Sequence, residues 1–182
     1  VSEYVKKGSL LDLRARRKGT SSYLANTVIP MLPHKLSNGI CSLNPNVERL
    51  ALSCIMEFDK KGNRTSYNIC KSVIKSNIKM SYEKVNMILN DGIISEGYSS
   101  HVDTLKNMEE LSKKLFEKRK RRGAVEINKP ELKLIMDDKS QVADFSKRYQ
   151  GRAESIIEEF MLITNETIAE DMFRNEYPLV FR

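Results

Sequence analysis

Large apolar residues recur at every second position in the segment from residue 50 to residue 58. They are Leu50, Leu52, Cys54, Met56 and Phe58. This period of two predicts a strand with one buried face. Residues 59–63, which contain Gly62, then turn the chain, and residues 64–76 are predicted to pair antiparallel with the strand. A second hairpin is predicted from residues 132–136 and 142–145, which flank a polar turn.

Apolar residues recur at helical spacing in four other segments. With the residues that cap them, these run from Ser9 to Gly19, from Ser81 to Gly92, from Ser100 to Gly123 and from about Arg152 to Phe173. A serine at the start of the first three is placed to cap the helix. On the last helix the apolar residues expected to face the core are Ile156, Ile157, Phe160, Met161, Ile168 and Met172.

The order of these elements predicts an α+β fold. Its expected architecture is a mixed, largely antiparallel sheet with long helices packed on it. Residues 20–45 are predicted to form an ordered but irregular loop, because Pro30, Pro33 and Pro45 interrupt any long regular element. The chain has 182 residues, which suits a single domain over residues 1–182.

Charge and cysteine content narrow the class of protein. Thirty-one Lys and Arg residues against 24 Asp and Glu residues give a net charge of +7, which favours a polyanionic partner such as nucleic acid. The alternative is that this excess of positive charge serves only to keep the protein soluble. Cys41, Cys54 and Cys70 form no CxxC pair, which indicates a reducing, cytoplasmic setting. No apolar run approaches the roughly 20 residues of a membrane span, so no membrane partner is expected.

Three stretches of irregular sequence carry a family resemblance. Residues 19–24 (Gly-Thr-Ser-Ser-Tyr-Leu), 28–33 (Val-Ile-Pro-Met-Leu-Pro) and 36–45 (Leu-Ser-Asn-Gly-Ile-Cys-Ser-Leu-Asn-Pro) are similar to the RNB catalytic domain of the ribonuclease R and ribonuclease II family. Further matches follow in the same order at residues 49–53, 122–125 and 156–165. The resemblance covers essentially the whole chain, which we interpret as an internal fragment of that domain, truncated at both ends.

The resemblance implies a processive 3′→5′ exoribonuclease that hydrolyses single-stranded RNA to nucleoside 5′-monophosphates with Mg²⁺. In the family, the aspartates that hold Mg²⁺ precede the segment similar to residues 1–5, and a catalytic arginine follows the segment similar to residues 178–182. We therefore expect no catalytic residue and no metal ligand in this chain. The fragment alone is expected to be inactive and to bind no Mg²⁺, because hard cations need several carboxylate oxygens.

Four residues are expected from the resemblance to contact RNA. Tyr23 matches a tyrosine that stacks on a nucleotide near the RNA 3′ end, and Glu158 matches a glutamate that contacts the terminal ribose. Asn165 shares a helix face with Glu158, and Ile127 stands where well-known members have a clamping phenylalanine. The alternatives are a Tyr23 packed under a loop and a solvated helix face at Glu158. The second alternative fits Glu159, Glu166 and Glu170 better than Glu158.

Two functions from other classes compete with the nuclease. A non-catalytic RNA-binding module would use the basic surface and Tyr23 to hold a strand, and a structural domain would use neither. The basic run at residues 118–122 either contacts RNA phosphates or neutralises the negative end of its helix. An exposed sheet edge would also allow the fragment to form a homodimer.

Overall fold

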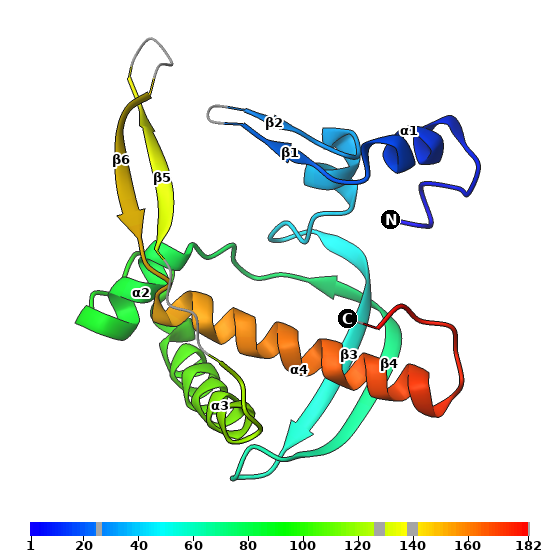
Figure 1. Cartoon of the computed structure of the whole chain (residues 1–182). Helices are drawn as coiled ribbons and strands as arrows, with labels where there is room; N and C mark the ends of the chain where they lie inside the picture. Colours follow the sequence, from blue (N-terminus) through cyan, green and yellow to red (C-terminus); the bar gives the residue numbers. More distant parts are fainter. Residues whose placement is uncertain (25–26, 126–129, 138–141, 182) are drawn as a thin grey trace. The chain divides into compact units, whose positions relative to one another are not determined.

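The computed structural model describes residues 1–24, 27–125, 130–137 and 142–181 (Figure 1). The described residues form four α-helices and two short helical turns, which are α1 (Leu10–Lys18), η1 (Lys35–Ile40), α2 (Tyr82–Asp91), η2 (Ser99–His101), α3 (Val102–Arg121) and α4 (Arg152–Arg174). They also form six strands, which are β1 (Ser22–Tyr23), β2 (Val28–Ile29), β3 (Glu48–Phe58), β4 (Arg64–Lys75), β5 (Glu131–Met136) and β6 (Val142–Arg148).

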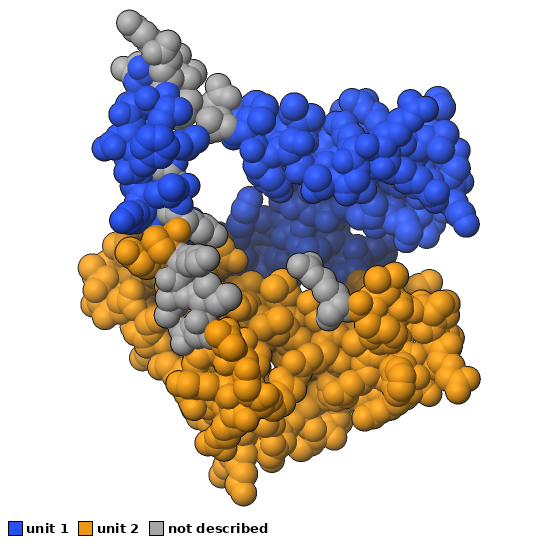
Figure 2. Space-filling model, viewed as in Figure 1, with its two compact units in different colours: residues 1–51, 72–79, 131–148 blue, residues 52–71, 80–130, 149–182 orange. Residues whose placement is uncertain are grey.

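The chain divides into two compact units, which Figure 2 shows in different colours. Unit 1 comprises Val1–Ala51, Ser72–Lys79 and Glu131–Arg148. Unit 2 comprises Leu52–Lys71, Met80–Pro130 and Tyr149–Arg182. The expectation of one domain over residues 1–182 stays a prediction.

The first helix of unit 1 has the predicted ends. The Ser9 hydroxyl accepts a hydrogen bond from the Asp12 backbone N–H at 3.3 Å, which caps α1. The Asp12 carboxylate in turn accepts from the Gly8 N–H at 2.8 Å. Gly19 then ends the helix with a φ of 68°, a left-handed value that favours glycine. The prediction of a short helix that begins at Ser9 and ends at Lys18 and Gly19 is confirmed.

The segment from residue 20 to residue 45 is more regular than predicted. β1 and β2 pair antiparallel, with Tyr23 opposite Val28, and a π-helical turn follows at η1. Pro30 directly follows β2, so it ends the strand instead of preventing it. The Ser21 hydroxyl accepts a hydrogen bond from the Met31 N–H at 2.9 Å, which ties the two sides of the hairpin together.

The predicted hairpin of long strands is confirmed as β3 and β4, which are hydrogen-bonded neighbours. Asp59 shapes its turn by accepting hydrogen bonds from the Lys61 and Asn63 backbone N–H groups at 2.9 and 2.8 Å. Contrary to the prediction from the sequence, buried and exposed positions do not alternate regularly along the whole of β3. Leu50 and Leu52 are 66% and 70% exposed, because consecutive half-buried residues at 53 and 54 shift the buried face by one position.

Three helices form the core of unit 2. α2, α3 and α4 contact one another pairwise, and the buried apolar residues that they contribute are Val85, Ile88, Leu105, Leu115, Ala153 and Ile156. The predicted cap of α2 is confirmed, because the Ser81 hydroxyl accepts from the Lys84 N–H at 3.4 Å. The prediction that Ile157 and Met161 of α4 face the core is wrong, because they are 45% and 54% exposed.

The predicted cap of α3 is also wrong. The residue that precedes α3 is His101, which makes no side-chain capping hydrogen bond. Ser100 lies inside η2, a short 3₁₀ turn that leads into the helix. Because the chain is already helical at this point, the serine has no free first-turn N–H group in front of it to cap.

The predicted fold class is confirmed: the chain combines helices with antiparallel strands. The hairpin of β5 and β6 is also confirmed, with Leu134 opposite Phe145. Within the described ranges the strands form three separate two-stranded sheets, β1–β2, β3–β4 and β5–β6. Dimerisation through a sheet edge stays a prediction. No helix in this part of the chain is long and apolar enough to cross a membrane.

Candidate functional site

Tyr23 lies on β1 of unit 1, and its side chain is largely free. The residue is 79% exposed. The backbone around it is held by the pairing with Val28 and by a hydrogen bond from the Leu24 N–H to the Thr27 carbonyl at 2.9 Å. In this structure the side chain is therefore not packed under a loop, and it is accessible for stacking.

Glu158 and Asn165 lie on α4 of unit 2, seven residues apart and therefore on the same face. The Glu158 side chain is 41% exposed. One of its oxygens accepts a hydrogen bond from Gln150 Nε2 at 2.5 Å, and the other lies 4.0 Å from the Arg119 guanidinium. The carboxylate is thus oriented from both sides and still has acceptor capacity towards solvent.

The neighbouring acid, Glu159, has a different environment from the one predicted. Its side chain is 6% exposed, and it accepts hydrogen bonds from Arg119 Nε and Nη2 at 3.1 and 2.5 Å. The hydrogen bonds to Glu159 hold the pKa of Arg119 above its usual value. The interpretation of Glu159 as part of a solvated face is wrong, because adjacent helical residues point about 100° apart and only Glu158 faces outward.

The start of α4 is fixed on the neighbouring helices. Asn86 of α2 donates to Glu154 at 2.9 Å and accepts from the Ala153 backbone N–H at 2.8 Å. Gly151 permits this approach, since a Cβ there would lie 2.4 Å from the Asn86 amide nitrogen. Arg152 adds hydrogen bonds to Glu109 and to the Leu89 carbonyl. These contacts set the position of the first turns of α4 and hence of Glu158.

Acidification is expected to remove the stability that Glu109 contributes. Hydrogen bonding from Arg152, followed by that from Lys113, holds the pKa of Glu109 below its usual 4.5 and outweighs desolvation. A carboxyl group with a lowered folded pKa stabilises the fold fully above the unfolded pKa, and this contribution is lost as the pH falls through the folded pKa. The unfolding free energies of the native chain and Glu109→Gln should therefore differ near neutral pH and converge in acid.

Urea unfolding across this pH range measures the effect. Glu110→Gln is the matched control, because Glu110 is 66% exposed and pairs with the neighbouring Lys114. Exposed pairs contribute little, so Glu110→Gln should stay close to the native chain throughout. A gap for Glu109→Gln that stayed constant down to the lowest pH would contradict the assignment.

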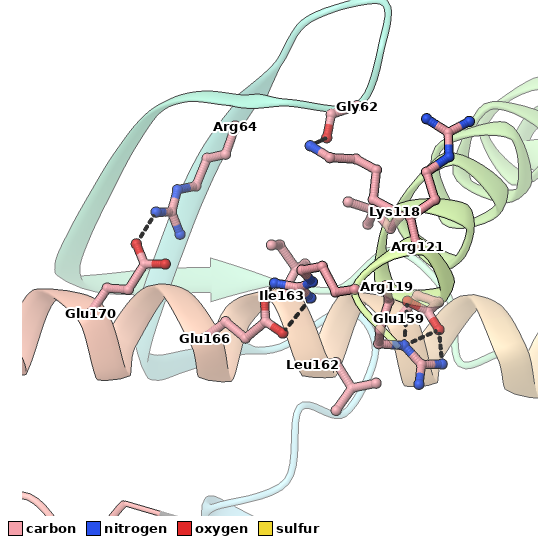
Figure 3. Close-up of a pocket in the computed structure, with 12 residues that line it drawn as sticks. Gly62, Arg64, Lys118, Arg119, Arg121, Glu159, Leu162, Ile163, Glu166 and Glu170 are labelled. Carbon is pink, nitrogen blue, oxygen red and sulfur yellow. Dashed lines mark hydrogen bonds and ion pairs between the residues drawn. The ribbon is translucent and has the colours of Figure 1, made fainter. Parts of the chain in front are cut away.

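A pocket of about 350 Å³ lies in unit 2 beside the β3–β4 turn (Figure 3). We call it the basic pocket, and its lining residues are Gly62, Arg64, Leu115, Lys118, Arg119, Arg121, Arg122, Glu159, Leu162, Ile163, Glu166 and Glu170. The sequence indicated only the basic run at residues 118–122. Arg64 was missed because it lies in a strand far away in sequence, and no local pattern connects it to α3.

The expected metal content and the expected roles of the site residues remain without a structural test. Ile127 lies outside the described residues. In the described ranges no group of three or more His, Cys, Asp or Glu side chains is arranged to hold a metal ion. The RNA-contacting roles of Tyr23, Glu158 and Asn165 stay predictions.

Comparison with known proteins identifies relatives over the whole length of the chain. Ribonuclease R of Thermotoga maritima is 46% identical over 183 residues, which cover 100% of this chain and 26% of the relative. Two solved structures of Mycoplasma genitalium RNase R are each 31% identical. The complex with ribose-methylated single-stranded RNA has a TM-score of 0.90 over 96% of this chain and 27% of its own. The complex with double-stranded RNA has a TM-score of 0.92 over 98% and 32%.

The chain therefore spans about a quarter to a third of the length of these relatives. The family model described as RNB domain matches residues 1–182. The match agrees with the helices and antiparallel hairpins described above. The chain belongs to the RNB domain family.

Proposed function

We propose that this chain is part of a processive exoribonuclease that hydrolyses single-stranded RNA from the 3′ end to nucleoside 5′-monophosphates. The observation that carries the proposal is the RNB domain match over residues 1–182. Ribonuclease R relatives and the RNase R complexes with RNA support it. Since the chain spans only part of these relatives, the proposal concerns a longer protein that contains it.

In this proposal the chain supplies surfaces that hold RNA. Tyr23, with its exposed ring, stacks on a base near the 3′ end, and stacking suits degradation without sequence preference because every base has a π-face. Glu158, held by Gln150 and facing Arg119, accepts hydrogen bonds from ribose hydroxyls. Such contacts favour RNA over DNA. Asn165, two turns further along α4, lies on the same face.

We propose a Mg²⁺ ion only for the longer protein that contains this chain. Mg²⁺ would supply charge neutralisation and an activated water there. The acids that line the basic pocket are paired with arginines: Glu159 with Arg119, Glu166 with Arg122 and Glu170 with Arg64. These carboxylates do not offer a hard cation the several free oxygens that it takes. We therefore propose that the 182-residue chain alone does not cut RNA.

The test is degradation of RNA labelled at its 5′ end in the presence of Mg²⁺, followed on a denaturing gel. The longer protein is expected to give a descending ladder that ends in short products, and the 182-residue chain alone is expected to leave the RNA intact. A ladder from the chain itself would show that the chain holds a metal site of its own and would contradict the proposal. Salt-sensitive binding without cleavage by the longer protein would favour the RNA-binding module instead.

The reducing, cytoplasmic setting is part of the same proposal. All three cysteines are free thiols, and each is half-buried. Unpaired thiols suit a compartment that keeps cysteines reduced.

A further inference from the structure

The basic pocket has more cations than acids on its walls. Its positive side chains come from Arg64, Lys118, Arg119, Arg121 and Arg122, and its negative side chains come from Glu159, Glu166 and Glu170. The difference is two positive charges. The positive side chains come from the start of β4 and from the end of α3, and the acids come from α4, so these charges line one pocket of unit 2 (Figure 3).

Each acid of the pocket already has an arginine partner. The ion pairs have N–O distances of 2.5 Å between Arg64 and Glu170, 2.5 Å between Arg119 and Glu159, and 2.8 Å between Arg122 and Glu166. Arg64 and Arg119 are also largely sheltered, with side chains 16% and 23% exposed. The two charges within each pair cancel. Lys118 and Arg121 are therefore the source of the excess positive charge.

Lys118 and Arg121 make no ion pair with a carboxylate in the described part of the chain. Lys118 Nζ donates to the Gly62 carbonyl at 3.0 Å and to Asn63 Oδ1 at 2.6 Å. An ammonium group has three N–H bonds, so one remains for a further acceptor. Arg121 follows three residues later, which places it on the same side of α3. Figure 3 draws both side chains at the pocket, with a dashed contact only at Lys118.

Neutralisation of the helix end does not account for this arrangement. The C-terminus of a helix carries roughly half a negative charge. The last turn of α3 carries four cations, Lys118, Arg119, Lys120 and Arg121. Even with Arg119 taken up by Glu159, three full charges face about half a charge. The surplus is available to an external anion.

We propose that the basic pocket binds a phosphate group, carried either by a free nucleotide or by an RNA strand. Arginine and lysine side chains are the usual protein donors to phosphate oxygens, and arginine presents several donors in one plane. The volume of about 350 Å³ lies within the range of roughly 300 to 1,000 Å³ seen for small-ligand sites. The lining residues do not include Tyr23, and the proposal does not depend on the nuclease activity proposed above.

The experiment titrates the ¹⁵N-labelled 182-residue chain with inorganic phosphate, uridine 5′-monophosphate and a short single-stranded RNA, each against sodium chloride of equal ionic strength. We expect saturable shifts of the backbone N–H signals of Gly62, Lys118 and Arg121. Lys118→Gln combined with Arg121→Gln should weaken binding by at least about fivefold, the effect of losing a contact of roughly 1 kcal/mol. Lys106→Gln, an exposed position earlier on α3, is the matched control and should bind like the native chain.

The ligands separate the two sources of phosphate. Saturation by the mononucleotide supports a free nucleotide, whereas saturation only by the RNA supports the backbone of a strand. No shift beyond that of sodium chloride with any ligand would overturn the proposal. The proposal would also be overturned if the double variant bound these ligands as tightly as Lys106→Gln does. Circular dichroism must show that both variants are folded.

Discussion

Replacement of Arg119 by alanine is expected to lower the free energy of unfolding by about 3 kcal/mol. The variant would leave Glu159, whose side chain is 6% exposed, without the hydrogen bonds that Arg119 provides. A charge left alone in a buried position costs more than the pair itself contributes, because the carboxylate has lost its water and gained nothing in return. Urea unfolding followed by circular dichroism measures the change.

Two variants show whether burial causes the effect. Arg122→Ala breaks a pair of the same chemistry with Glu166, but the two side chains are 61% and 38% exposed, so a loss below about 1 kcal/mol is expected. Arg119→Met combined with Glu159→Leu removes both charges and should recover much of the stability. Equal losses for Arg119→Ala and Arg122→Ala would mean that the burial of Glu159 contributes nothing.

Elements whose signals are local could be predicted from the sequence. Ser9 and Ser81 cap their helices as predicted, because an N-cap depends only on a hydroxyl and the N–H groups of the next turn. Long strands and long helices were also placed correctly, since their apolar periods are set by backbone geometry. Ser100 shows the limit: the same residue type lost its role because the chain before α3 was already turning.

Burial and partners depend on which elements meet, and the sequence does not contain this information locally. Glu158 and Glu159 are identical neighbours, yet Glu159 accepts hydrogen bonds from Arg119, a residue 40 positions earlier, whereas Glu158 lies 4.0 Å from it. Ile157 has the same apolar character as Ile156 but points to solvent. The basic pocket has the same origin, because it needs Arg64 from a strand and acids from α4, and only the fold brings them together.

Replacement of Tyr23 by alanine in the longer protein is expected to weaken binding of a short single-stranded RNA and to change the length of the final product. Tyr23 is 79% exposed on a two-residue strand, so the substitution removes little packing. Loss of one stacked base costs about 1 to 3 kcal/mol, or roughly five- to 150-fold in affinity. Fluorescence anisotropy without Mg²⁺ measures binding, and a gel with Mg²⁺ measures the end product.

The aromatic ring, and not the hydroxyl, is the group that this interpretation requires. Tyr23→Phe keeps the π-face and should retain both the affinity and the product length of the native protein. Tyr149→Ala removes a tyrosine that is 66% exposed elsewhere in the chain and controls for general loss of aromatic surface. If Tyr23→Ala and Tyr149→Ala change RNA binding and product length equally, Tyr23 has no specific stacking role, and the RNA 3′ end is held by other residues.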